Sequence, residues 1–190
     1  LGDVYKRQLV MKARDMSIFG DAFKSKMTIV SWASLINSVG AWLLLLVTSK
    51  GLLDIVLHPQ FKNNRQLYLS YVSGGDTGAN IKVSRFDFDQ RTNSLKNRYK
   101  IFDAVPKVFG GRHFGGRMTF DRLGYLFIST GDRGEMHRAQ DVNDHSGSII
   151  RVHDDGRTPH ENPIFQTLGT RTAIFSFGHR NPHVSYTHLR

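Results

Sequence analysis

The chain has 190 residues, of which 39% are hydrophobic, and it contains 18 glycines, 13 phenylalanines and no cysteine. This length and composition support one folded domain with a hydrophobic core, and the lack of cysteine excludes disulfides, thiolate metal sites and a cysteine nucleophile. The formal net charge is +10, but residues 51–183 hold 18 Lys and Arg against 13 Asp and Glu. Because no basic stripe or nucleic-acid-binding motif accompanies this charge, we expect no nucleic-acid partner.

The two ends of the sequence differ from its body. Residues 1–8 (LGDVYKRQ) and 184–190 (VSYTHLR) have no periodicity and resemble translated adapter sequence. Residues 27–49 carry no charge and rise to an apolar run, a pattern that a signal peptide, a membrane span, an out-of-frame translation or a buried core segment would each explain. We expect residues 1–50 to be an artefact or a signal- or membrane-like segment and residues 184–190 to be an artefactual tail.

From Gly51 onward, short runs with a period near two predict half-buried strands. Residues 66–72 (QLYLSYV) and 81–88 (IKVSRFDF) alternate most clearly, and residues 121–124 (DRLG) predict a hairpin turn. Further predicted strands are residues 98–102, 117–120, 125–129, 148–152 and 173–177. Since no long helical pattern separates these strands, the sequence predicts an all-β fold rather than βαβ units.

A turn pattern occurs twice in the body of the chain. Residues 120–125 (FDRLGY) and 152–157 (VHDDGR) both place an aspartate and then a glycine after a strand. Such a repeated corner favours a propeller over a sandwich.

Four motifs place polar or ionisable side chains beside glycine near predicted strands: residues 51–54 (GLLD), 113–117 (HFGGR), 131–134 (GDRG) and 178–182 (GHRNP). Glycine permits tight turns and the close approach of backbone to a ligand. A base, a carboxylate and a cation at such junctions predict a single reactive site.

Each candidate residue also has a simpler interpretation. The His113 imidazole can act as a base near neutral pH, or it can be an ordinary loop histidine. Asp132 can hold an imidazole in one tautomer or bond its own backbone in a turn. Arg180 and Asn181 offer donors to a carboxylate or oxyanion, or they end a solvated strand. The histidines show no metal-ligand spacing, so the metal ligands are unknown.

Four segments, taken in order, resemble the soluble quinoprotein sugar dehydrogenases, the pyrroloquinoline quinone (PQQ)-dependent glucose and aldose dehydrogenases: residues 51–71, 113–134, 145–156 and 174–182. The resemblance implies a six-bladed β-propeller that holds PQQ and Ca²⁺. Residues 51–183 would form a partial propeller of about three blades, preceded by a non-homologous apolar segment. Ser49 and His183 stand where the family commonly has glutamine.

The resemblance also implies roles for residues. His113 matches the general base and Asp132 the residue that orients it, whereas Arg180 and Asn181 match residues that bind PQQ. The implied reaction oxidises the anomeric C1 hydroxyl of an aldose to the lactone, with hydride transfer to PQQ. An aldose and an external electron acceptor would be the partners, and the protein would be periplasmic or secreted. Because the later blades carry the family's calcium ligands, we expect this fragment alone to be inactive.

Two other interpretations remain open. One is a non-enzymatic propeller of the same superfamily that binds a glycan or a protein. The other is a membrane-anchored β protein, if residues 27–49 span a bilayer. The presence of His113, Asp132 and Arg180 together favours the enzyme, because a binding module needs no base with an orienting carboxylate.

Overall fold

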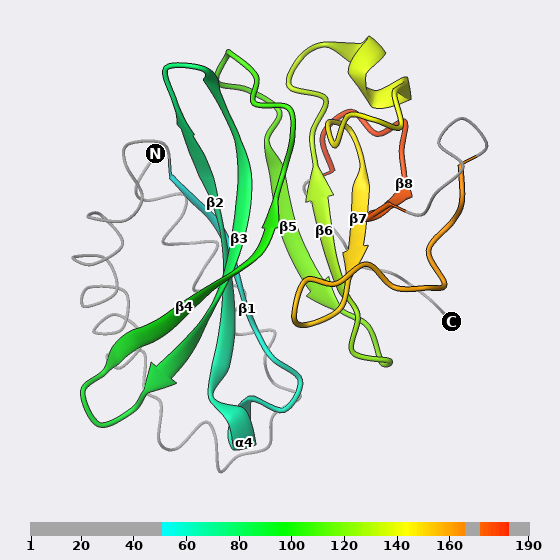
Figure 1. The fold of residues 1–190 in the computed structure, drawn as a ribbon. Coiled ribbons are helices and arrows are strands. Elements are labelled where there is room, and N and C mark those ends of the chain that lie inside the picture. The colour runs from blue at the N-terminus through cyan, green and yellow to red at the C-terminus, as the bar shows by residue number, and fades with distance from the viewer. Residues whose placement is uncertain (1–50, 166–171, 183–190) are drawn as a thin grey trace. The chain divides into compact units, whose positions relative to one another are not determined.

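A computed structural model describes residues 51–165 and 172–182, shown in colour in Figure 1. These residues belong to one compact unit. The predictions made for residues 1–50 and 184–190 lie outside the described residues. In the described ranges, no helix has both the length and the apolar character needed to traverse a bilayer.

The first sheet contains β1 (Leu52–Leu57), β2 (Gln66–Gly75), β3 (Gly78–Asp89) and β4 (Ser94–Asp103) in that order. All neighbours are antiparallel (Figure 1). A single helical turn, α4 (Phe61–Asn64), connects β1 to β2. This sheet is a meander in which each strand pairs with the next along the chain.

The second sheet repeats this arrangement with shorter strands. It contains β5 (Gly115–Phe120), β6 (Leu126–Thr130), β7 (Ile149–Val152) and β8 (Ile174–Ser176), again antiparallel and in chain order. A 3₁₀ turn, η2 (Met136–Gln140), follows β6.

The strands predicted from alternation are confirmed, with ends that differ by a few residues. The hairpin turn after β5 is also confirmed: the Asp121 N–H donates to the Tyr125 carbonyl, and Asp121 Oδ1 accepts the Leu123 and Tyr125 N–H groups. After β7, the Gly156 N–H donates to the His153 carbonyl in a comparable turn. The two helical turns were not predicted, because one turn is too short to show periodicity.

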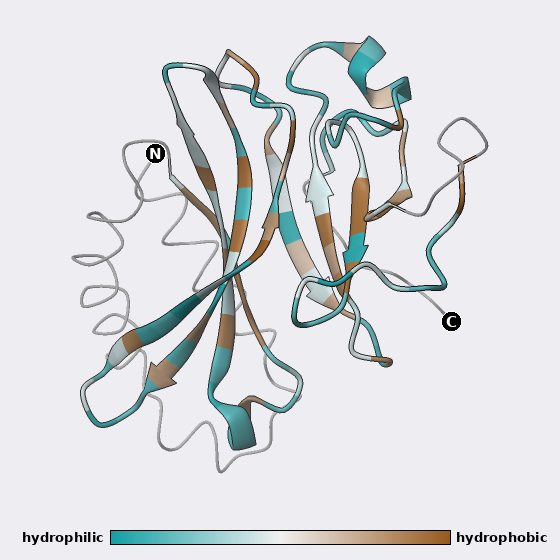
Figure 2. Cartoon of the chain, in the orientation of Figure 1, coloured by the Kyte–Doolittle hydropathy of each residue, from teal (hydrophilic) through white to brown (hydrophobic). Residues whose placement is uncertain are grey.

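The main hydrophobic core lies between the two sheets. Tyr68, Ile81 and Val83 of the first sheet share one cluster with residues of the second sheet, among them Ile128 and Ile150, and all five have 0% of their surface exposed. Hydrophobic and hydrophilic residues alternate along these strands in Figure 2. A second cluster covers the opposite face of the first sheet with Phe61, Leu67, Leu69, Tyr71 and Phe86. The first sheet is therefore packed on both faces.

Polar groups also join the sheets where β1 lies beside β5. The Asp54 carboxylate accepts the Met118 N–H at 2.9 Å, and the Ser70 hydroxyl donates to the Gly116 carbonyl at 2.5 Å. Asp54 is only 4% exposed and also lies 3.7 Å from the Arg117 guanidinium. The carboxylate of the GLLD motif thus holds two sheets together.

The fold class is all-β, as predicted, and two four-stranded antiparallel sheets are consistent with two blades of a propeller. The sequence predicted about three blades. The described residues contain two such sheets, so the number of blades is not confirmed.

Candidate functional site

The strand pairing of the second sheet brings the HFGGR and GDRG motifs together. Gly115 at the start of β5 pairs with Thr130 at the end of β6. The residues just before β5 and just after β6 therefore lie at the same edge of the sheet, and the Gly131 N–H donates to the Phe114 carbonyl at 3.1 Å. His113 and Asp132 are adjacent for this reason.

The His113 ring and the Asp132 carboxylate form a short hydrogen-bonded pair. The distance from Nδ1 to Oδ1 is 2.6 Å. Since a carboxylate accepts a proton from this nitrogen, Nδ1 carries the hydrogen and Nε2 keeps its lone pair in the neutral ring. The His113 side chain is 23% exposed, and Nε2 has no hydrogen-bond partner within residues 51–165 and 172–182. The geometry supplies a base with an orienting carboxylate behind it.

Asp132 is fixed from several directions. Its side chain is 2% exposed, its carboxylate accepts the Gly134 N–H at 2.7 Å, and its own N–H donates to the Arg180 carbonyl at 2.8 Å. Burial acts to raise the pKa of Asp132, but the Gly134 N–H, the His113 ring and the Arg180 charge outweigh it and lower that pKa below its ordinary value. Asp132 is therefore ionised near neutral pH.

Gly131 permits the close approach on which this arrangement depends. A Cβ atom at this position would lie 2.0 Å from the His113 carbonyl oxygen and 3.0 Å from Asn181 Oδ1. No other residue type fits without moving backbone. The first glycine of the GDRG motif thus lets three segments meet.

The GHRNP motif lies at the same place. The side-chain amide oxygen of Asn181, Oδ1, accepts the Gly115 N–H at 3.1 Å. Arg180 is exposed, and its guanidinium makes no hydrogen bond or ion pair with any other residue of the described ranges. All four residues predicted for the site, His113, Asp132, Arg180 and Asn181, therefore occupy one locality, whereas Asp54 of the GLLD motif does not join them.

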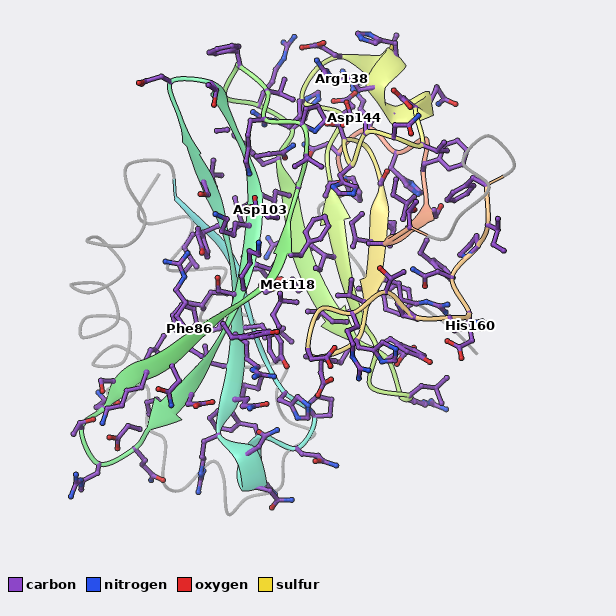
Figure 3. All side chains as sticks on the ribbon, in the orientation of Figure 1. Phe86, Asp103, Met118, Arg138, Asp144 and His160 are labelled. Carbon is purple, nitrogen blue, oxygen red and sulfur yellow. The ribbon has the colours of Figure 1, made fainter. Side chains whose placement is uncertain are left out.

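The segment that follows Asp132 is fixed by hydrogen bonds from Arg138. Arg138 of η2 donates to Glu135 at 2.9 Å and to the buried Asp144 at 2.7 Å. Figure 3 shows Arg138 and Asp144 near one another at this turn. These two hydrogen bonds raise the pKa of the Arg138 guanidinium, and they fix the backbone that leaves the site.

Arg133 lies in the GDRG motif itself, but the sequence did not predict it as part of the site. Arg133 is 3% exposed, and its guanidinium contacts the loop that carries His113. An arginine beside a glycine is usually solvated, so the motif gave no sign of its burial.

No metal centre is formed by the described residues alone. Within those ranges, no group of three or more His, Asp or Glu side chains is arranged to hold a metal ion. The metal ligands, which the sequence left unknown, are still unassigned.

Comparisons with known proteins identify the family. The sequence profile described as "Glucose / Sorbosone dehydrogenase" matches residues 28–189. This range extends beyond residues 51–183 at both ends, and the prediction that the flanking segments are foreign stays a prediction. Aldose sugar dehydrogenase YliI of Escherichia coli (strain K12) is 39% identical over 133 residues, which are 70% of this chain and 36% of that protein.

Two solved structures share the fold. The apo form of the soluble aldose sugar dehydrogenase from Escherichia coli has a TM-score of 0.65 and 38% identity, covering 69% of this chain and 38% of that one. The PQQ-bound aldose sugar dehydrogenase from Streptomyces coelicolor has a TM-score of 0.58 and 27% identity, covering 70% and 37%. The chain spans 36% of the length of the E. coli relative. Because the family profile covers most of the sequence, the chain belongs to the glucose/sorbosone dehydrogenase family.

Proposed function

We propose that this chain is part of a PQQ-dependent dehydrogenase that oxidises the C1 hydroxyl of aldose sugars to the lactone, with His113 as general base. The observation that carries the proposal is the 2.6 Å pair between His113 Nδ1 and Asp132 Oδ1, which leaves Nε2 able to accept a proton. A base held by a buried carboxylate serves proton removal, whereas a module that only binds a glycan or protein has no use for it.

The exposed residues beside this pair are suited to PQQ. PQQ carries three carboxylates and two quinone oxygens, and the exposed Arg180 guanidinium is a rigid fork of donors whose charge also acts on Asp132. Asn181 adds a neutral amide at the same place. When bound, PQQ accepts the hydride from C1 of the sugar.

His113 and Asp132 perform the proton transfer. His113 Nε2 takes the proton of the C1 hydroxyl as the C–H bond breaks, so that one hydride and one proton leave the sugar and the ring oxygen and carbonyl of a lactone remain. The ring then becomes positively charged, and the ionised Asp132 stabilises that charge at Nδ1. Asp132 also fixes the tautomer before the reaction begins.

We propose that the whole protein binds Ca²⁺, but we assign no Ca²⁺ ligand among the described residues. The described ranges offer no cluster of His, Asp or Glu ligands for a metal ion. The roles proposed for His113 and Asp132 therefore do not depend on Ca²⁺. An external electron acceptor, a periplasmic or secreted location and the inactivity of this chain by itself remain proposals that rest on the family.

A chimera tests the function directly. Residues 51–183 would replace the matching segment of the E. coli aldose sugar dehydrogenase, and dye reduction by aldoses would be measured after addition of PQQ and Ca²⁺. We expect activity, and we expect His113→Ala to lower kcat by at least about 100-fold because the base is lost.

His137→Ala is the matched control, since the His137 side chain is 79% exposed and its ring lies 3.7 Å from the Glu135 carboxylate. It should retain the activity of the parent chimera. An equal loss in the two variants, or activity unchanged in His113→Ala, would refute the role of His113.

A further inference from the structure

Arg133 is a buried cation that the proposed reaction does not use. It is 3% exposed, and burial lowers its pKa to about 10, although Asp132 and Glu135 act in the opposite direction. No carboxylate makes an ion pair with it among the described residues. Burying an unpaired charge is strongly unfavourable, so local contacts have to compensate for the water that is lost.

Those contacts all lie on the loop that carries His113. Arg133 Nη2 donates to the Gly110 carbonyl at 2.6 Å, and Nη1 donates to the Arg112 carbonyl. The guanidinium carbon lies 3.4 Å from the centre of the Phe114 ring, a cation–π stacking distance. One planar group therefore holds residues on both sides of His113.

Backbone–backbone hydrogen bonds among the described residues do not fix this loop. Between the bridge from Val108 to Ala79 and the bond at Phe114, residues 109–113 make no backbone–backbone hydrogen bond with any part of the described chain. His113 also adopts a left-handed backbone with φ of +52°, which a non-glycine residue rarely adopts unless its surroundings impose it. The Arg133 fork is a direct means of imposing it.

We propose that Arg133 is a positioning residue that fixes the backbone on both sides of His113, while its neighbour Asp132 fixes the ring. The proposal rests on the assignment of His113 as the base. It attributes the effect to the planar fork and not to the charge, because two carbonyls and one ring face are bound at once. Lysine carries the same charge but cannot make these three contacts.

The test measures the tautomer of His113 in the full 190-residue chain labelled with ¹⁵N-histidine. Proton–nitrogen NMR of the ring distinguishes hydrogen on Nδ1 from hydrogen on Nε2. In the parent chain we expect the Nδ1–H form alone. In Arg133→Lys we expect that form to fall to about half or less.

Arg151→Lys is the matched control. Arg151 also stacks on an aromatic ring, 4.5 Å from the centre of Phe175, and donates to Asn162 at 2.7 Å, but it lies on β7. This variant loses similar packing and should leave the His113 signals unchanged. Should Arg133→Lys fail to fold, Arg133→Met removes the charge and keeps an unbranched side chain, and the same loss of the Nδ1–H form is expected.

Two results would overturn the proposal. One is a folded Arg133 variant that keeps a single Nδ1–H tautomer at His113. The other is an Arg151→Lys chain that loses the tautomer to the same extent, because the effect would then be general. Neither measurement depends on sugar oxidation, so an active His113→Ala chimera would refute the proposed function without affecting this result.

Discussion

In the first sheet, the long strands β2 and β3 pair without a register shift, from the Gln66–Asp87 pair to the Gly75–Gly78 pair. The strands of the second sheet are shorter, with 6, 5, 4 and 3 residues. The site residues lie on the connections of that second sheet. Long regular strands bury apolar faces efficiently, and short strands leave more chain at their ends to present polar groups. The two sheets have the same topology, but the first mainly buries apolar side chains and the second presents the polar side chains of the site.

Left-handed non-glycine residues occur in both regions of the molecule. In the first sheet, left-handed non-glycine residues occur at α4, at the β3–β4 turn and within β4, away from the site. Around the site, both His113 and Arg133 have positive φ, at +52° and +59°. Positive φ in such residues is tolerated where the surrounding contacts determine it, so we expect the backbone at the site to be sensitive to changes in those contacts.

The largest effect is expected from Gly131→Ala. The new Cβ would meet the His113 carbonyl oxygen at 2.0 Å, and relief requires backbone movement. We expect a loss of about 3 kcal/mol in the free energy of unfolding and separation of His113 from Asp132, measured by urea unfolding and by the His113 ring signals.

Gly111→Ala is the control for this change. Gly111 lies two residues before His113, in the loop that Gly131 approaches, and a Cβ there would meet no atom within 4 Å. Its stability should match that of the parent chain. If both variants unfold alike, the close approach at Gly131 is not the cause.

A smaller effect is expected where the two sheets join. Asp54→Ala leaves the buried Met118 N–H without its acceptor, and we expect a loss of about 2 kcal/mol in the free energy of unfolding. Asp54→Asn keeps one oxygen acceptor and should lose less. The comparison is made by urea unfolding, and an alanine variant as stable as the parent would show that Asp54 does not hold the sheets together.

The smallest effect is a dependence of stability on pH. His145 accepts the Val105 N–H at Nδ1, and burial lowers its pKa below the ordinary 6.5, although Asp144 and Asp103 oppose this and Lys107 assists it. The unfolded chain therefore binds the proton more readily. The neutral His145 ring contributes its full stabilisation above pH 6.5, and this contribution is lost as the pH falls from 6.5 through the lowered pKa.

His145→Asn checks this assignment, because its amide oxygen can replace Nδ1 as the acceptor but does not titrate. The decline in unfolding free energy between pH 7.5 and 5.5 should be smaller in this variant. An identical decline in the parent and the variant would assign the pH dependence to another group.

Part of the site was predictable from the sequence. His113 and Asp132 were identified because their glycine-rich motifs resemble those of a known family, and the 2.6 Å pair confirms that they meet. Arg133 was not identified, although it is adjacent to Asp132. Whether an arginine is solvated or buried depends on the loop that folds over it, and that loop lies about 20 residues earlier in the chain.

The amino-acid sequence by itself determined the strands, the hairpin turns and the all-β class, because alternation and turn residues act over a few neighbouring positions. The tertiary structure alone decided that Asp54 joins two sheets and that His145 receives a backbone N–H from Val105. It also decided that Arg133 holds the loop of His113. These contacts connect residues far apart in the chain, and their strength depends on burial, which arises only when the sheets pack.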